Sequence, residues 1–312
     1  MIHKIDLIEE TRAKRLKIFK IVSLVALGIL VVSLILFLIK QFALKENDTL
    51  FTVAVFFLII AIATFIIGTA SSNAGYDKFV KEHLENEIMK DVYSGNEFSY
   101  AARNGISFQE MNISGIFKNP DQFSTSDTIR TTYKEVNLVL SDYIFTRIVV
   151  TTDSKGNTTT HHYPYPGRYM SFSIKRNFMA GVSIIDKRNN GDVFYLKPYR
   201  EKPEFESMEF EKKFYTTSTD KEKAFLVIRP KEIMDFIDLS KTYQGKIVNV
   251  LYGHTIYLIL ADTKIEFSFS IFRKIDQGLI RDIYAYYELP LRIIDKLKLD
   301  GDRYNAKELG WN

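Results

Sequence analysis

Cysteine is absent from the 312 residues of the chain, and only one tryptophan and seven prolines occur. Without cysteine the chain has no disulfide, no thiolate metal ligand and no cysteine nucleophile. The lack of disulfides is typical of a reducing compartment, although a domain of this size does not depend on them. Fold class and location must therefore be inferred from other features of the sequence.

The chain also lacks a strong excess of charge of one sign outside its N-terminal region. Residues 1–70 hold eight basic and five acidic residues, which leaves 34 basic and 33 acidic residues for 71–312. A nucleic-acid-binding protein normally carries a basic excess that replaces the counterions on phosphate. We therefore expect no nucleic-acid partner.

Two long apolar runs lie near the N-terminus. Residues 21–39 carry no charge between Lys20 and Lys40, and at about 1.5 Å per residue they span roughly 28 Å as a helix, close to a bilayer core. The second run, 50–70, is similar. A buried core helix is the alternative, but both runs are apolar around their whole circumference. The sequence predicts two transmembrane helices, at 21–39 and 50–70.

Basic residues flank the two runs unevenly. The tail 1–20 holds six lysines and arginines, whereas the connection 40–49 holds two, and three more lysines follow the second run by residue 90. Lysine and arginine near a span resist translocation. We therefore expect both termini in the cytoplasm of a multi-pass protein in a cell membrane, such as a bacterial inner or plasma membrane. The short connection would lie outside.

The remaining sequence predicts one α+β domain. A stalk helix is expected over 71–95, and a soluble cytoplasmic domain over 96–312. From about Thr131 the pattern alternates as in strands, around the polar loop TTDSKGNTTT, with no helical crossover between the strands. A largely antiparallel sheet is therefore expected.

Helices are expected in the C-terminal third of the domain. Pro230 is well placed in the first turn of one helix. Two further strands would meet at a Gly253-His254 turn, and a last helical stretch would be interrupted at Pro290.

Motifs of known chemistry are missing. The sequence has no G-x-S-x-G, H-E-x-x-H, phosphate-binding G-x-x-x-x-G-K-[ST] or G-x-G-x-x-G pattern. We therefore predict no catalytic, cofactor-binding or metal-binding residues and no cofactor. His161 and His162 are the pair closest to an enzyme site, but adjacent strand residues point apart, and a solvated hairpin is favoured.

Aromatic residues are abundant, with 24 phenylalanines and 18 tyrosines. Tyrosines next to arginine are common at protein interfaces. The candidate interaction patch consists of Tyr163, Tyr165, Arg168 and Tyr169. The alternative is a packed hairpin whose tyrosines form hydrogen bonds at the rim of the core.

The segment ESMEFEKKFYTTSTDKEKAFLVIRPKEIMDFI carries the most specific spacing in the chain. Its key positions are Glu209, Phe210, Phe214, Asp220 and Pro230. Together with FQEMNISGIF and the Phe178–Gly181 strand, it resembles the bacterial family known as domain of unknown function 3137, over roughly residues 76–270. Ala224-Phe225-Leu226 departs from the Ala-Arg-Tyr run of that family.

The resemblance implies a membrane-attached domain and no known activity. By their chemistry, Phe210 and Phe214 are expected to anchor the core, and Asp220 to cap a turn or the next element. The motif is therefore interpreted as structural.

Two classes of function remain open. The first is a membrane-anchored cytoplasmic interaction or sensing domain without catalytic chemistry, whose partners are the bilayer and an unknown protein or lipid; self-association into a homo-oligomer is compatible with it. The second is a membrane-tethered enzyme, such as a hydrolase of unknown substrate. A transporter is disfavoured because the two predicted spans contain no ionisable residue.

Overall fold

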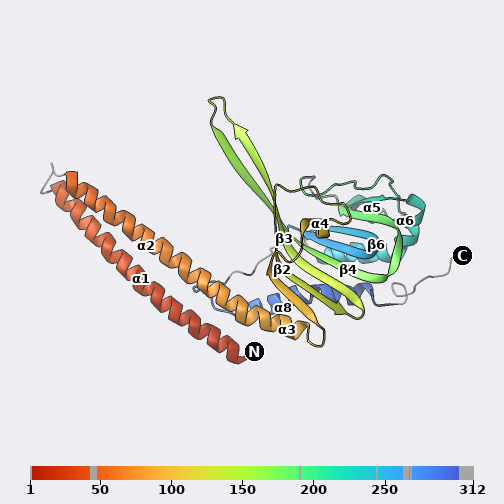
Figure 1. Ribbon diagram of the computed structural model, residues 1–312, viewed down its shortest axis with the longest axis horizontal. Coiled ribbons are helices and arrows are strands. Elements are labelled where there is room, and N and C mark those ends of the chain that lie inside the picture. Colours follow the sequence, from red (N-terminus) through yellow and green to blue (C-terminus); the bar gives the residue numbers. More distant parts are fainter. Residues whose placement is uncertain are drawn as a thin grey trace. The chain divides into compact units, whose positions relative to one another are not determined.

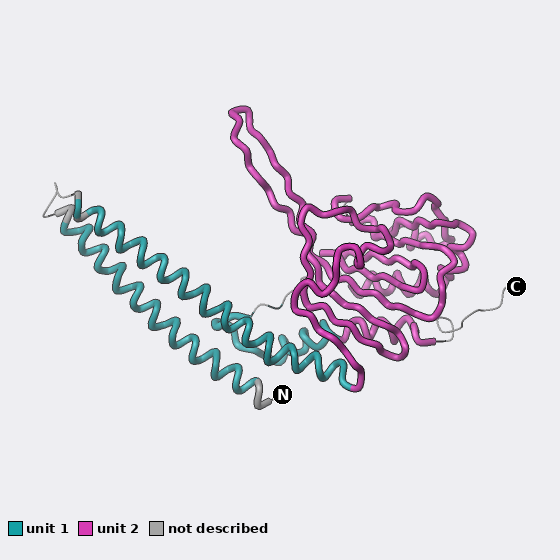
Figure 2. Tube along the Cα trace, in the orientation of Figure 1, with its two compact units in different colours: residues 1–94, 267–287 teal, residues 95–266, 288–312 magenta. Residues whose placement is uncertain are grey.

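The computed structural model describes residues 2–42, 48–189, 191–243, 245–262, 267 and 269–301. The chain divides into two compact units, which Figure 2 shows in different colours. Unit 1 holds residues 1–94 and 267–287, and unit 2 holds residues 95–266 and 288–312.

Unit 1 is built on two long helices, α1 (Ile2–Phe42) and α2 (Asp48–Val80), which run side by side in opposite directions (Figure 1). Both are long and apolar enough to cross a membrane. The basic segment 2–20 and the apolar run that follows are one uninterrupted helix. A π-helical turn, η1 (Lys81–Glu85), and the short helix α3 (Asn86–Val92) continue from α2. The predicted connection 40–49 falls partly outside the described residues.

Small residues recur every seven positions where α1 and α2 face each other. They are Ala26 and Ser33 on α1, and Ala54, Ala61 and Gly68 on α2. A seven-residue repeat keeps one side of a helix turned toward its neighbour, and small side chains allow the two backbones to approach closely. The Ser33 hydroxyl donates to the Ala54 carbonyl at 2.7 Å. The hairpin is therefore held by packing and a direct interhelical hydrogen bond.

The segment 269–287 returns to unit 1 and is fixed there through its backbone. The N–H of Phe269 donates to the Asp77 carboxylate at 2.8 Å, and the Ile271 carbonyl accepts from Arg12 at 3.2 Å. Polar side chains of α1 and α2 thus bind backbone groups that lie 259 and 192 residues away in the sequence.

Unit 2 contains an antiparallel sheet, which confirms the predicted α+β class. Its described strands are β1 (Phe98–Arg103), β2 (Gln122–Tyr133), β3 (Val136–Thr152), β4 (Thr158–Asp186), β5 (Phe214–Ser218) and β6 (Lys246–Ala261). Their order is β1-β2-β3-β4-β5, and β6 also pairs with β4.

Strand β4 joins the sheet together because it pairs with three others. The first part of β4, residues 158–173, pairs with β3. Its end, residues 182–186, pairs with β5. Residues within 167–185 pair with β6. Beyond the body of the sheet, β3 and β4 pair only with each other and project as a two-stranded arm (Figure 1). The hairpin predicted around TTDSKGNTTT is this arm.

In the described part of the chain, four short helices lie in unit 2, and one longer helix, α8, is shared between the two units. They are α4 (Phe108–Met111), α5 (Met208–Lys213), α6 (Lys221–Val227), α7 (Pro230–Thr242) and α8 (Gln277–Leu297). Helix α7 begins at Pro230, as predicted, with the proline at its first turn. Helix α8 belongs to unit 1 up to residue 287 and to unit 2 from 288.

One face of the sheet is closed by an aromatic cluster. The Phe117 ring lies 5.1 Å from that of Phe145 and 5.2 Å from that of Phe194, and the Tyr143 ring lies 4.9 Å from that of Phe145. All four side chains are buried. Edge-on and tilted aromatic pairs of this kind add to the stabilisation from burial itself.

Two turns differ from the sequence prediction, in which the strand pattern starts at about Thr131 without a turn and two strands meet at Gly253-His254. The strands β2 and β3 meet at Lys134 and Glu135, both with positive φ (47° and 64°), in a two-residue turn that glycine or asparagine would normally mark. Gly253 also has positive φ (58°), but it is opposite Phe178 at a bulge, and β6 continues through it. The predicted interruption at Pro290 is wrong: helix α8 continues through it, although an interior proline removes one backbone hydrogen bond and crowds the carbonyl four residues earlier.

The helical hairpin predicts a specific cross-link. A Cβ on residue 68 would lie 3.6 Å from the Cβ of Val22, within the range that disulfides span. We expect V22C/G68C to form an intramolecular disulfide on mild oxidation, read out as protection from a mass-tagged maleimide.

The chain has no native cysteine, so the background is zero. The control L24C/G68C should not cross-link, because Leu24 is 67% exposed on the outside of the hairpin. Equal cross-linking of both pairs would contradict the described helix packing.

Candidate functional site

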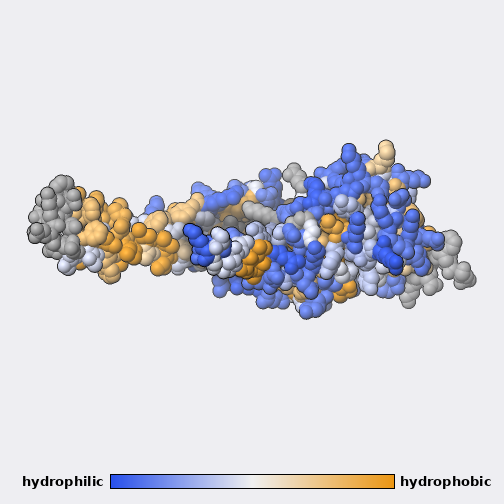
Figure 3. All heavy atoms as spheres, turned by 90° about the horizontal axis from the view of Figure 1, so that it is seen from above, coloured by the Kyte–Doolittle hydropathy of each residue, from blue (hydrophilic) through white to orange (hydrophobic). Residues whose placement is uncertain are grey.

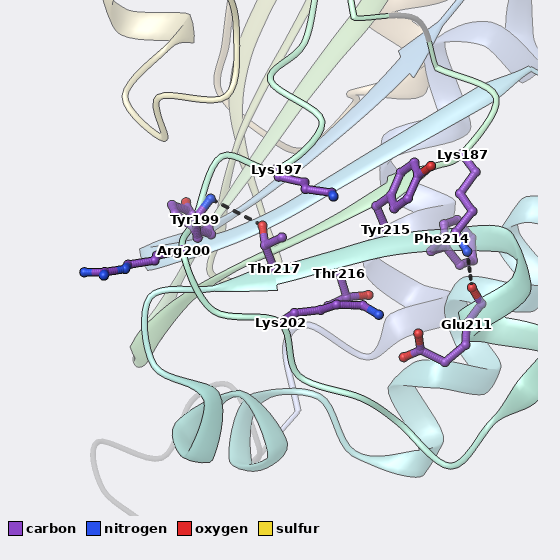
Figure 4. Close-up of a pocket in the computed structure, with 10 residues that line it drawn as sticks. All are labelled: Lys187, Lys197, Tyr199, Arg200, Lys202, Glu211, Phe214, Tyr215, Thr216 and Thr217. Atoms are coloured by element: carbon purple, nitrogen blue, oxygen red, sulfur yellow. Dashed lines mark hydrogen bonds between the residues drawn. The ribbon is translucent and has the colours of Figure 1, made fainter.

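A cleft lies along the edge of the sheet in unit 2 and encloses about 360 Å³. Its walls come from β5, from the segment 197–202 and from α5 (Figure 4). The lining residues are Lys187, Lys197, Tyr199, Arg200, Lys202, Glu211, Phe214, Tyr215, Thr216 and Thr217. The volume is at the small end of the range of ligand-binding pockets.

Basic side chains dominate this cleft. Four of its lining residues are cationic, and one, Glu211, is acidic. The Lys187 amine lies 5.1 Å from the centre of the Tyr215 ring, and the Lys197 amine lies 6.0 Å from it. Lys187 also donates to the backbone carbonyl of Glu211 at 2.6 Å. Cation–π contacts and this hydrogen bond restrict the long lysine side chains before any ligand arrives.

The lysines and the arginine point in different directions. Figure 4 shows the amine of Lys197 near Tyr215, that of Lys187 at the backbone carbonyl of Glu211 and that of Lys202 near Thr216, whereas Arg200 extends away from the cleft. The carboxylate of Glu211 accepts the backbone N–H of Phe205 at 3.0 Å, so the acidic group of the lining is already engaged.

Two neighbouring threonines of β5 differ in their hydrogen bonding. Thr217 Oγ1 forms a 2.7 Å hydrogen bond with Ser183 Oγ and accepts the backbone N–H of Tyr199 at 3.3 Å. Thr216 is 2% exposed, and its hydroxyl has no hydrogen-bond partner in the described part of the chain. A buried hydroxyl without a partner is costly, by about 1–3 kcal/mol. It is therefore a group for which a bound ligand could supply the missing partner.

The edge of β5 adds backbone groups to the cleft. Ser218 exchanges both of its backbone hydrogen bonds with Glu201, at 2.8 and 3.0 Å, on the side away from β4. Because the backbone groups of an antiparallel strand alternate in direction, those of Thr216 point to the same side as those of Ser218. The cleft is therefore lined by main-chain as well as side-chain polar groups.

The Tyr199 phenol in the wall of the cleft is protonated and hydrogen-bonded. Burial raises the pKa of Tyr199 well above its usual value, so its phenol stays protonated at physiological pH, and its hydroxyl donates to the Ser114 carbonyl at 3.4 Å. Among the described residues, no group of three or more His, Asp or Glu side chains is placed to hold a metal ion.

The four residues of the predicted interaction patch do not share one exposed surface. Tyr163 is 47% exposed, and Tyr165 is half-buried and donates to Asp192 at 2.9 Å. Arg168 and Tyr169 are buried. Successive residues of a strand point to opposite faces, which places Arg168 on the face opposite the three tyrosines. Only the part of β4 near Tyr163 presents an aromatic ring to solvent.

Arg168 instead forms an ion pair inside the sheet. Its Nε donates to Asp142 Oδ1 at 2.9 Å, and both side chains are almost fully buried. Asp142 and Arg168 are directly opposite each other on β3 and β4. His161 and His162 lie further along β4 on the exposed arm, where adjacent residues point to opposite faces.

The residues of the C-terminal motif shape the wall of the cleft. The rings of Phe210 and Phe214 are buried 5.1 Å apart, and Phe214 also lines the cleft. Asp220 is the N-cap of α6 and accepts the Lys223 N–H at 3.0 Å, which lowers the pKa of its carboxyl. Glu209 forms an exposed ion pair with Lys241 at 3.0 Å. The motif thus fixes β5 between its flanking helices.

Comparison with known proteins supports one relationship. Residues 165–299 match the family described as protein of unknown function (DUF3137), which confirms the resemblance; the match begins and ends later than the stretch expected from the motifs. It includes every residue that lines the cleft. No match was found among the curated proteins or among the solved structures.

The buried ion pair provides a test of the structural role of Arg168. Removing one partner of a buried pair leaves the other charge uncompensated, at a cost of about 3–5 kcal/mol. We expect R168M to lower the free energy of unfolding by this amount, measured by urea denaturation of the full chain in detergent.

The matched control is Y163F, on an exposed position of the same strand, which should change the stability by less than about 0.5 kcal/mol. An R168M protein as stable as the native chain would show that the pair does not support the sheet.

Proposed function

We propose, from the premise that residues 165–299 belong to the DUF3137 family, that the chain is a membrane-anchored binding domain. In this proposal α1 and α2 hold the protein in a cell membrane, and unit 2 recognises a partner in the cytoplasm. The exposed apolar surface of the α1–α2 hairpin is the observation that carries the proposal.

In Figure 3 hydrophobic residues gather along the hairpin, whereas most of the visible surface of unit 2 is hydrophilic. Leu24, Ile59 and Ile67 are 67%, 58% and 66% exposed, and most of the apolar stretch in each helix is unburied. In water such a surface would drive association or aggregation, whereas in a bilayer it is matched by lipid chains. The two helices also satisfy their own backbone hydrogen bonds, as a spanning segment must.

The orientation follows from the basic residues of α1. Arg12, Lys14, Arg15 and Lys17 precede the apolar stretch on the same continuous helix, and Lys78 and Lys81 follow the stretch in α2. Both basic ends would therefore stay on the cytoplasmic side. In this proposal both termini and unit 2 lie in the cytoplasm.

The cleft beside β5 supports a binding role for unit 2. Two of its four cations, Lys187 and Lys197, lie against the Tyr215 ring, and Lys187 also donates to the Glu211 carbonyl. The Glu211 carboxylate accepts the Phe205 N–H. A fixed set of donors in a concave site is suited to recognising an anionic group. We assign recognition to this cleft, with a protein, lipid or small molecule as the carrier of the anion.

Single cysteines test the orientation. We expect N47C, in the connection between α1 and α2, to react with an impermeant maleimide on intact cells, and S154C, in the arm of β3 and β4, to react only after permeabilisation. The native chain supplies a cysteine-free background.

Permeabilised cells provide the control, since both positions should then be labelled. Labelling of S154C but not N47C on intact cells would invert the proposed topology. Recovery of the full chain in the soluble fraction at physiological salt would refute the membrane anchor itself.

A further inference from the structure

We propose that the cleft beside β5 is a binding site for a phosphate monoester, carried by a small molecule or by a lipid headgroup. The inference deepens the proposed function, because it rests on the use of this cleft for recognition. It does not depend on the orientation of the membrane anchor.

The first argument is the kind of cation in the cleft. The amines of Lys187 and Lys197 lie beside the Tyr215 ring on one face of the β5 edge, and the amine of Lys202 lies near Thr216 on the other, whereas the guanidinium of Arg200 is turned away (Figure 4). An anion at this edge can therefore be reached by amines from both faces. Arginine recognises a planar carboxylate through two parallel hydrogen bonds, whereas lysines act as separate point charges. Amines that approach from several sides fit the three terminal oxygens of a phosphate monoester better than a flat carboxylate.

The second argument is the buried hydroxyl of Thr216. It lines the same space, is 2% exposed, and lacks a hydrogen-bond partner within the described residues. Its neighbour Thr217 satisfies its own hydroxyl with Ser183 and Tyr199, so β5 does not leave its threonines unpaired as a rule. A phosphate oxygen would accept the Thr216 O–H and remove the cost of the unpaired group.

The third argument is the size of the cleft and its closed end. About 360 Å³ is enough for a phosphate with a small organic substituent. An extended acidic peptide would need to add a strand to β5, but β5 has five residues and its last, Ser218, is already paired with Glu201. The geometry therefore favours a compact ligand over a peptide strand.

The negative groups near the cleft limit the affinity without occupying the site. Glu211 is in the lining, but its carboxylate accepts the Phe205 N–H. Glu204 lies 3.6 Å from the Lys202 amine in an exposed pair, which contributes little and is readily exchanged for a ligand. Added salt should weaken binding, since the lysines are exposed.

The experiment uses the full chain in nanodiscs of phosphatidylcholine, titrated with glycerol 3-phosphate in a calorimeter. We expect saturable binding that strengthens between about pH 5 and pH 7, because the second pKa of a phosphate monoester is near 6 and the dianion binds the cations more tightly. The double variant K197Q/K202Q should bind at least about tenfold more weakly.

Thr216 separates a binding role from a structural one. T216V removes the hydroxyl at nearly constant shape, so we expect about tenfold weaker binding with no loss of thermal stability. T216S keeps the hydroxyl and should bind like the native chain. K212Q, which removes an exposed lysine of α5 outside the lining, is the matched charge control and should also bind normally.

A second arm distinguishes the sources of the phosphate. If a lipid headgroup is the natural occupant, phosphatidic acid in the nanodiscs should compete with glycerol 3-phosphate in the native chain; without competition, the ligand is a soluble molecule. Both results keep the proposal. It is overturned if glycerol 3-phosphate does not bind, if K212Q and K197Q/K202Q weaken binding equally, or if hexaglutamate binds more tightly than the phosphate. These failures would leave the cysteine-labelling result, and thus the anchor, unaffected.

Discussion

The fold of unit 2 depends on the continuity of β4. This strand has 29 residues and carries β3 and then β5 along one edge while β6 follows the other. A strand of that length cannot stay flat, because twist accumulates along it. The register shifts beside Phe178 accommodate this change in direction. The same strand can therefore form the arm at one end and pair with β5 at the other. The position of the cleft is therefore set by the far end of the strand that builds the sheet.

Regular patterns predicted the parts of the fold in which local and tertiary preferences agree. The apolar runs, the alternating strands and the helix at Pro230 all correspond to described elements. The turn predictions that were wrong concern positions where strand pairing overrides the local turn preference of the sequence. Lys134 and Glu135 adopt positive φ without glycine because the strands on both sides are held in register, and Gly253 marks a bulge because β6 gains more by continuing along β4 than by turning back.

The candidate site was hidden from the sequence for a related reason. Residues 187–202 hold five basic and two acidic residues, but the basic ones are spread over 16 positions and form no continuous run. Over 71–312 this local excess is cancelled by acidic residues elsewhere. Pairing of β5 with β4 brings Lys187 next to Tyr215, and the bridge between Glu201 and Ser218 brings the segment 197–202 alongside. The tyrosines near Arg168 were more conspicuous in the sequence, but around Arg168 both faces of β4 are buried. The sequence signal that could have indicated the site is the Phe210–Phe214 motif, which fixes β5.

Lysines beside an edge strand also have a simpler use. Charged side chains at a sheet edge discourage pairing with another chain, and β5 is a short edge that needs such protection. That role explains exposed lysines that point into solvent. It does not explain why the amines of Lys187 and Lys197 lie against the ring of Tyr215. It explains the unpaired hydroxyl of Thr216 even less, because edge protection gains nothing from burying a polar group without a partner. A site that holds two of its lysines against an aromatic ring and leaves one buried donor without a partner is better accounted for by a ligand that completes it.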